Sequence, residues 1–259
     1  MIHKLTSIHP DAKIGENVKI DPFTSISGDV TIGDGTWIGP NVSIMDGAVI
    51  GKNCKIFPGA VVSAIPQDMK YKGEATNVLI GDNTIIREFV TINKGTSAKD
   101  KTIIGNNTLI MAYTHVAHDC KIGNNCILVN YVGLAGEVEI DDFAILAGGS
   151  LVHQFVRIGK HAMVGGGAKV RIDVPPYVRA DREPLAYVGV NAIGLRRRGF
   201  TNEKIAEIQE IYRDLYEHKL NNSQALKMIE QNYPDSEERN GIISFFKDST
   251  RGIIRSSVQ

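Results

Sequence analysis

The chain has 259 residues, of which 42% are hydrophobic, and its 29 Lys and Arg balance its 29 Asp and Glu. That length allows one or two domains with a substantial core. The balanced charge argues against nucleic acid or an anionic membrane as a partner. The N-terminus lacks the apolar core of a signal peptide, and no segment approaches the ~20 apolar residues of a membrane span. We therefore expect a cytoplasmic protein.

A six-residue hydrophobic repeat runs through most of the chain. From Ile8 to Val170 every sixth residue is Ile, Val or Leu in one phase. We call these the hexad positions; the exceptions are Asp68, Glu74 and Ala98. A period of six fits neither an α-helix nor an alternating strand. It is typical of a hexapeptide-repeat solenoid, so the sequence predicts a mainly β protein, a parallel β-helix whose stacked coils bury a continuous core.

Small residues occupy the place two before each hexad position. The three cysteines, Cys54, Cys120 and Cys126, all lie there. A thiol at such a position behaves as a small hydrophobe, so we expect all three to point inward, with no role in a disulfide or a metal site.

Glycine directly follows many hexad positions, as at Gly15, Gly33, Gly51 and Gly105. Glycine adopts positive φ angles without steric cost. We therefore expect these glycines to form corners with unusual backbone angles.

The organisation along the chain is a solenoid over residues 1–187 and an α-helical domain over 188–259. Segments near 64–78 and 95–101 leave the repeat and are predicted to be projecting loops, which on a rigid scaffold often carry function. In the helical part, Thr201 is expected to cap a first helix, followed by a second over 223–232 and a third over the apolar residues near 242–246. These helices are expected to cover the open end of the solenoid.

A histidine cluster is the strongest indication of chemistry. His115, His118 and Asp119 fit neither inward class, so they are expected to face the surface. If one coil takes 18 residues, Gly136 and Gln154 stack on His118 at ~4.8 Å per coil. Residues distant in sequence would then meet in one polar column beside a histidine.

Histidine is also a zinc ligand, and His115, His118 and His153 have the composition of an open three-ligand site. However, His153 would lie two coils from His118, so we favour a site without metal.

Several motifs point to one family. They are Gln67–Tyr71, His115–Asp119, Val152–Phe155, Asp173–Tyr177 and Val190–Phe200. Together they resemble the acyl-carrier-protein-dependent UDP-N-acetylglucosamine O-acyltransferases, which begin lipid A synthesis. The resemblance covers nearly the whole chain. It implies a homotrimer of left-handed β-helices with active sites in the clefts between subunits.

The resemblance also implies a mechanism. His118 would be the general base that deprotonates the sugar 3-hydroxyl, and Asp119 would orient its imidazole. The backbone N–H of Gly136 would stabilise the oxyanion. The acyl group would pass directly from acyl carrier protein to UDP-N-acetylglucosamine, with no acyl-enzyme and no cofactor.

The resemblance also assigns substrate-binding roles to residues at matching positions. Residues at substrate-contacting positions are Asp68, Lys70, His115, His153 and Gln154. Asn191, Arg197 and Arg198 match positions near the nucleotide and the phosphopantetheine arm, and Gly166 matches the position that sets the depth of the acyl groove. Glu137 and Asn93 stand where the best-known members carry histidines.

A cluster of arginines is a candidate docking site for the acyl donor. Acyl carrier proteins are acidic, and Arg179, Arg182 and the arginines at 196–198 are close enough in sequence to form a local basic patch.

Three other functions are compatible with the sequence. They are an N-acyltransferase acting on an amino sugar nucleotide, a zinc carbonic anhydrase on the same solenoid and a non-catalytic scaffold.

Overall fold

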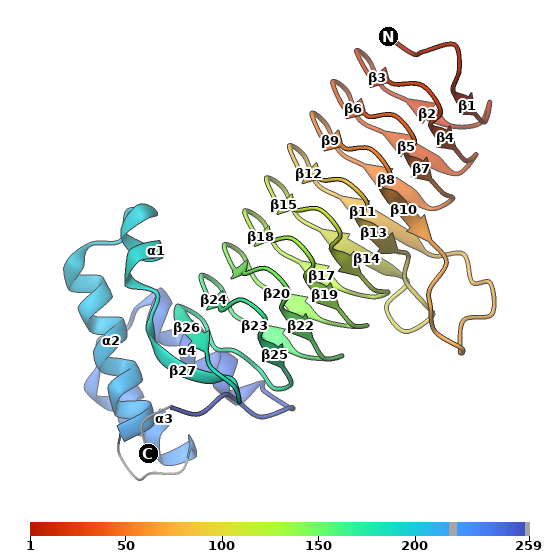
Figure 1. Cartoon of the computed structure of the whole chain (residues 1–259). Coiled ribbons are helices and arrows are strands. Elements are labelled where there is room, and N and C mark those ends of the chain that lie inside the picture. The colour runs from red at the N-terminus through yellow and green to blue at the C-terminus, as the bar shows by residue number, and fades with distance from the viewer. Residues whose placement is uncertain (218–221, 257–259) are drawn as a thin grey trace.

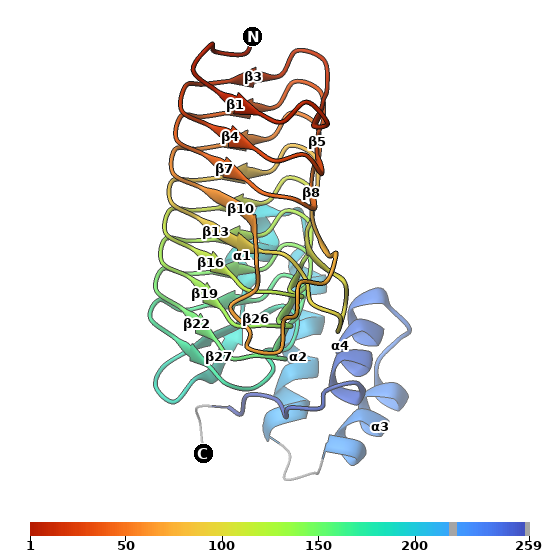
Figure 2. The same ribbon diagram turned by 90° about the vertical axis from the view of Figure 1, so that its right-hand side faces the viewer.

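The protein is a straight, three-sided column of stacked coils with helices at its C-terminal end (Figures 1 and 2). The structure, a computed structural model, describes residues 1–217 and 222–256. Each side of the column is one sheet of parallel strands, built from every third strand of the chain, and the third sheet ends in β26 and the antiparallel β27. The N-terminus lies at the free end of the column, far from the helices.

In the described part of the chain the sheets have nine, eight and ten strands. The first sheet contains β1 (Ser7–Ile8), β4 (Ser25–Ile26), β7 (Ser43–Ile44), β10 (Val61–Ala64), β13 (Thr91–Asn93), β16 (His115–Val116), β19 (Gly133–Leu134), β22 (Leu151–Val152) and β25 (Lys169–Val170). The second contains β2 (Lys13–Ile14), β5 (Val30–Ile32), β8 (Ala48–Ile50), β11 (Asn77–Ile80), β14 (Lys101–Ile104), β17 (Lys121–Ile122), β20 (Glu139–Ile140) and β23 (Arg157–Ile158). The third contains β3 (Lys19–Ile20), β6 (Trp37–Ile38), β9 (Lys55–Ile56), β12 (Ile85–Ile86), β15 (Leu109–Ile110), β18 (Ile127–Leu128), β21 (Ile145–Leu146), β24 (Met163–Val164), β26 (Val178–Asp181) and β27 (Ala186–Val190).

The strand register confirms the 18-residue coil. Ile8 pairs with Ile26, and Val116 pairs with Leu134, each 18 residues further on. From Ile20 onward, the apolar hexad residues are buried and form the core. The column therefore has three corners per coil. The first corner joins the first sheet to the second, the second corner joins the second sheet to the third, and the third corner leads back to the first sheet.

Two insertions explain the three failed hexad positions. Val62 pairs with Ile92, 30 residues on, and Ile80 pairs with Ile104, 24 residues on. Relative to an 18-residue coil, these coils carry 12 and 6 extra residues, both multiples of six. The hexad phase therefore survives across both. The extra residues form a first loop (residues 65–76) and a second loop (94–100), and both leave from the first corner and run along the edge of the column (Figure 2).

The glycines that follow hexad positions do not form left-handed corners, so that prediction was wrong. Positive φ instead occurs three residues after a hexad position, for example at Asn17, Asn53 and Asn125. The glycines are required by close stacking of coils. A Cβ on Gly33 would lie 2.6 Å from the carbonyl carbon of Gly51 in the next coil.

The C-terminal part contains four helices in the described residues: α1 (Ala192–Arg197), α2 (Asn202–Glu217), α3 (Asn222–Asn232) and α4 (Glu237–Lys247). Thr201 accepts the Lys204 N–H at 3.2 Å, as predicted for the helix cap. Three of the helices were predicted, whereas the short α1 was not. The helices lie against the last coils and cover that end of the column (Figure 1).

The predicted boundary between 187 and 188 falls inside β27, which pairs antiparallel with β26. Of the predicted helical domain 188–259, residues 218–221 and 257–259 lie outside the described part. No helix among the described residues has the length and apolar character needed to cross a membrane.

The cysteines point inward as predicted, and all three are buried. Burial raises the pKa of the Cys120 and Cys126 thiols to about 12. Both therefore stay protonated and pack as small apolar groups.

Candidate active site

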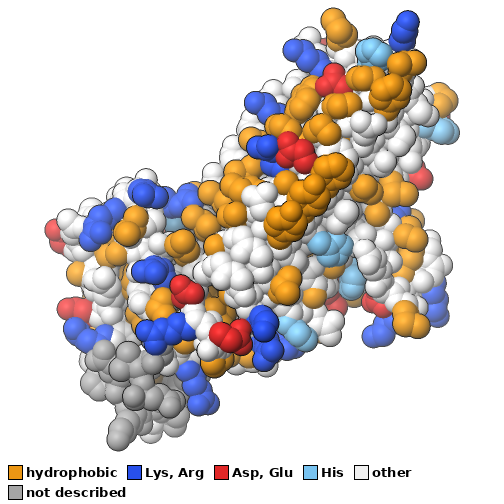
Figure 3. Space-filling view, viewed as in Figure 1, with side chains coloured by type: hydrophobic (Ala, Val, Ile, Leu, Met, Phe, Trp, Pro, Cys, Tyr) orange, Lys and Arg blue, Asp and Glu red, His pale blue; other side chains and the backbone are white. Residues whose placement is uncertain are grey.

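Polar residues from successive coils meet at the first corner of the column. The Glu137 N–H donates to the His118 carbonyl at 3.0 Å, and the Phe155 N–H donates to the Gly136 carbonyl at 3.2 Å. These bonds stack His118, Gly136 and Gln154 in adjacent coils, which is the column predicted from the 18-residue period. Figure 3 shows histidine side chains on this side of the solenoid, beside a long run of hydrophobic side chains.

His118 and Asp119 form a hydrogen-bonded pair. The distance from His118 Nδ1 to Asp119 Oδ2 is 2.8 Å, and the histidine side chain is 17% exposed. An ionised carboxylate only accepts, so Nδ1 carries the proton and Nε2 presents its lone pair. This is the tautomer that a general base requires.

Asp119 does not face the surface, and that expectation was wrong. Its side chain is fully buried because the second loop folds over it. The backbone N–H and the hydroxyl of Thr96 both donate to the carboxylate. Asp119 also adopts a left-handed φ of 60°, which turns its side chain under the second loop.

Gly136 lies directly beneath the imidazole of His118. A Cβ at this position would lie 2.6 Å from both Cε1 and Nε2 of the ring. Among the described residues, the Gly136 N–H donates no hydrogen bond. The corner thus combines a basic nitrogen with a free backbone donor, and only glycine leaves room for the ring.

The first loop returns to the same site. Asp68 Oδ2 lies 3.7 Å from His118 Nε2, and Asp68 Oδ1 accepts the Lys70 N–H at 2.9 Å. The Lys70 side chain is exposed. Asn93 was noted only as a departure from the family, yet it is buried and its amide donates to the Ile65 carbonyl at 3.0 Å. Asn93 therefore fixes the start of the loop that carries Asp68.

The other predicted histidines flank the column. His115 lies on β16, where its Nδ1 is 2.7 Å from the Thr91 hydroxyl, and burial lowers its pKa. His153 and Gln154 are exposed in the second coil beyond His118. Arg251 was not predicted to lie near the site; it belongs to the C-terminal segment and donates to His153 Nδ1 at 3.3 Å.

Asn191, Arg197 and Arg198 are not brought to the His118 column within one chain. Asn191 is buried, caps α1 and donates to the His161 carbonyl at 3.0 Å. The Arg198 guanidinium lies over the Phe143 ring at 4.5 Å. Both contacts place the beginning and end of α1 at the second corner of the column, whereas His118 is at the first.

Gly166 lies at the third corner, on the coil that begins at β22, two strands beyond β16 in the first sheet. A Cβ there would meet nothing closer than the Gly148 carbonyl oxygen at 3.4 Å, and at Gly167 nothing within 4 Å. This part of the corner is therefore bare.

A ladder of exposed aromatic rings precedes the bare corner and was not predicted. Phe89 stacks on Tyr113 and Tyr113 on Tyr131, with ring centroids 5.2 and 5.1 Å apart. The ladder ends where Gly149 and Gly167 take the same position in the following coils. Its sequence signal was an aromatic residue three places after the equivalent hexad position in successive coils, namely Ile86, Ile110 and Leu128. The ladder leads into the bare corner at Gly166.

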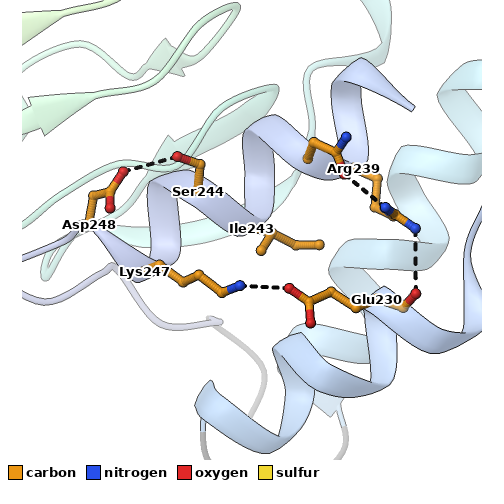
Figure 4. A pocket seen from close by; sticks show the side chains of 7 residues that line it. Glu230, Arg239, Ile243, Ser244, Lys247 and Asp248 are labelled. Atoms are coloured by element: carbon orange, nitrogen blue, oxygen red, sulfur yellow. Dashed lines mark hydrogen bonds and ion pairs between the residues drawn. The ribbon is translucent and has the colours of Figure 1, made fainter. Parts of the chain in front are cut away.

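A shallow hollow between α3 and α4 offers no comparable chemistry (Figure 4). Lys247 Nζ is 2.6 Å from Glu230 Oε1, and Arg239 donates to the Glu230 carbonyl at 3.5 Å. Its charges thus pair with one another. Over residues 1–217 and 222–256, no group of three or more His, Cys, Asp or Glu is arranged to hold a metal ion.

The fold and site define a class of protein, the hexapeptide-repeat transferases. A family model described as bacterial transferase hexapeptide (six repeats) matches residues 11–36, 29–64 and 101–136, and one described as UDP N-acetylglucosamine O-acyltransferase, domain 2, matches 173–254. An acyl-[acyl-carrier-protein]–UDP-N-acetylglucosamine O-acyltransferase of Chlorobium phaeobacteroides is 57% identical over 97% of this chain and 96% of its own length.

Solved structures of UDP-N-acetylglucosamine acyltransferases are similar to this chain over nearly its whole length. A UDP-N-acetylglucosamine acyltransferase from Bacteroides fragilis is 53% identical, covers 98% of this chain and 100% of its own, and has a TM-score of 0.97. The Francisella novicida enzyme is 44% identical over 100% of this chain and 95% of its own, with a TM-score of 0.96. The chain belongs to the family of acyl-[acyl-carrier-protein]–UDP-N-acetylglucosamine O-acyltransferases. The predicted fold class, a left-handed parallel β-helix with a C-terminal helical part, is confirmed.

The contact between Gly136 and His118 gives a direct test. Gly136→Ala places a methyl group 2.6 Å from the ring, so we expect the base to be displaced and kcat to fall on the order of 100-fold. The melting temperature should change little. Gly241→Ala is the control, since its Cβ would meet only the end of the Lys160 side chain, with Cε 3.7 Å away. Normal turnover in Gly136→Ala would show that the ring position is not needed for activity.

Proposed function

We propose that the protein transfers a 3-hydroxyacyl group from acyl carrier protein to the 3-hydroxyl of UDP-N-acetylglucosamine, the first step of lipid A biosynthesis. The observation that carries the proposal is the His118–Asp119 pair, whose free Nε2 lies beside Gly136 and Asp68. Membership of a family whose relatives carry this activity in their names supports it.

The reaction proceeds by direct transfer. His118 Nε2 takes the proton of the sugar hydroxyl as its oxygen attacks the thioester carbonyl. The Gly136 N–H donates to the oxyanion of the tetrahedral intermediate. The carbon–sulfur bond then breaks, and the imidazolium returns its proton to the departing thiolate. Cys120 follows Asp119 at this corner, but its thiol is buried against the Ala135 carbonyl and burial raises its pKa to about 12, in keeping with a path that has no acyl-enzyme.

Substrate recognition is assigned to the residues around the base. Asp68 and Lys70 on the first loop, with His115, His153 and Gln154 on the coils, would contact the sugar nucleotide and the acyl group. The acyl donor would bring its own phosphopantetheine, so no further cofactor takes part. We place the reaction in the cytoplasm, as expected from the sequence.

The proposed homotrimer gives Asn191, Arg197 and Arg198 a role that one chain alone does not. Since α1 lies at the second corner and His118 at the first, a neighbouring copy would present its α1 to the His118 column. Arg179, Arg182 and the arginines at 196–198 are the positions proposed to dock the acidic carrier.

The acyl chain is assigned to the bare third corner. Gly166 lies in the second coil beyond that of His118, 48 residues on, which is ~13 Å along the column at 18 residues and ~4.8 Å per coil. The aromatic ladder supplies an apolar approach, and each buried methylene of the acyl chain adds ~0.8 kcal/mol of binding. Such a groove favours a long acyl group.

The central test is an assay of His118→Ala with UDP-N-acetylglucosamine and a panel of acyl carrier protein thioesters. Removing a general base typically costs ~10²–10⁴ in rate, and the variant should melt near the wild-type temperature because His118 lies outside the core. Wild-type turnover in this variant would refute the mechanism. Acylation of a 3-amino analogue in preference to the natural sugar would instead favour the N-acyltransferase.

Subunit mixing tests the shared site. His118→Ala and Arg198→Ala should each be nearly inactive alone. When they are co-expressed in equal amounts, about a quarter of the sites in random cyclic trimers combine an intact His118 with a neighbour's intact Arg198. Activity should therefore reappear in the purified mixture. A mixture as inactive as its parents would place both residues in one subunit's site.

Gly166→Met tests the acyl groove. The added side chain would fill the bare corner, so we expect the preferred donor to become shorter, with little loss of stability because nothing lies nearer than 3.4 Å. Competition between donors of different length reports the change. An unaltered length profile would show that the groove does not end at Gly166.

A further inference from the structure

The buried carboxylate of Asp119 has an unusual set of partners. Among the described residues its only ion-pair partner is His118. Thr96 makes the other two hydrogen bonds to the Asp119 carboxylate. Its backbone N–H donates to Oδ1 at 2.9 Å, and its hydroxyl donates to Oδ2 at 2.6 Å. While His118 is neutral and able to act as a base, the buried carboxylate depends on such donors, so Thr96 both solvates it and sets its plane.

The contacts of the Thr96 hydroxyl direct its proton toward Asp119. Its oxygen accepts the Ala98 N–H at 3.2 Å, which leaves the hydroxyl proton for Asp119. Thr96 itself is 7% exposed and is separated from the space around His118 Nε2 by the carboxylate. It therefore acts on Asp119 and has no contact with the reacting atoms.

The second loop is built to hold this residue. A Cβ at Gly95 would overlap the backbone nitrogen of Lys101, and the Thr76 hydroxyl donates to the Gly95 carbonyl at 2.6 Å. At the other end of the loop, Lys99 Nζ is 2.8 Å from Glu139 Oε1 on β20. The loop is thus tied to the first loop and to the following coils.

We propose that Thr96 is a positioning residue for acyl transfer: it holds the Asp119 carboxylate in the plane from which Asp119 orients His118. The inference rests on the proposed role of His118 as the base. It gives the six-residue insertion a function, since the insertion delivers two donors to a carboxylate whose other side-chain partner is His118.

The test compares Thr96→Val with Thr96→Ser. Valine keeps the shape and the backbone donor but removes the hydroxyl, so kcat should fall on the order of ten-fold while KM for UDP-N-acetylglucosamine stays unchanged. Serine keeps the hydroxyl and should restore most of kcat. Thr96→Ala repeats the loss of the hydroxyl should valine prevent folding.

Thr84→Val is the matched control. Thr84 is equally buried and its hydroxyl donates to the Gly105 carbonyl at 2.7 Å, but it lies beside the third sheet. This variant should lose stability and keep kcat. A drop of kcat in Thr84→Val equal to that in Thr96→Val would overturn the proposal, as would wild-type kcat in Thr96→Val.

A double variant isolates the coupling. In an Asp119→Ala background there is no carboxylate left to position, so adding Thr96→Val should cost no further activity. Fully additive losses would overturn the proposal. Wild-type turnover in His118→Ala would remove the proposed function itself, whereas an inactive His118→Ala beside a fully active Thr96→Val would remove only the role of Thr96.

Discussion

The stacking of coils at an 18-residue interval is the constraint on which the rest of the structure depends. Parallel strands place Leu134 between Val116 and Val152, and backbone bonds continue this register through the corners. Because the core side chains fix the phase, each outward residue has a defined neighbour one coil away. His118, Gly136 and Gln154 converge for this reason alone. A rigid column of this kind holds reactive groups in place without any adjustment of loops.

The insertions add to the column what its own residues cannot supply. Both loops leave from the first corner, and both are multiples of six residues long, so neither disturbs the register. The first returns with Asp68 to face His118 Nε2, and the second covers Asp119. A surface column of polar residues thereby becomes a partly enclosed site, in which the base is mostly buried and its carboxylate partner is fully buried.

Glycines near the corners occur for three different physical reasons. Gly33 and its equivalents are small because the next coil stacks directly on them. Gly136 is small because the imidazole of a catalytic candidate occupies the space of its side chain, whereas Gly166 faces open space. The sequence pattern does not distinguish these cases, since all three are glycines near a corner. Their neighbours in the folded protein do.

The sequence by itself determined the solenoid, its coil length, the inward cysteines and the His118 column, because a strict period of six leaves one way to bury the apolar residues. It also indicated three of the four helices through their caps and apolar faces. Only the tertiary structure decided the burial of Asp119, the contacts of Thr96, Asn93 and Arg251, and the separation of α1 from His118. These depend on where loops and the C-terminal segment fold back, and contacts between residues so far apart in sequence leave no local pattern.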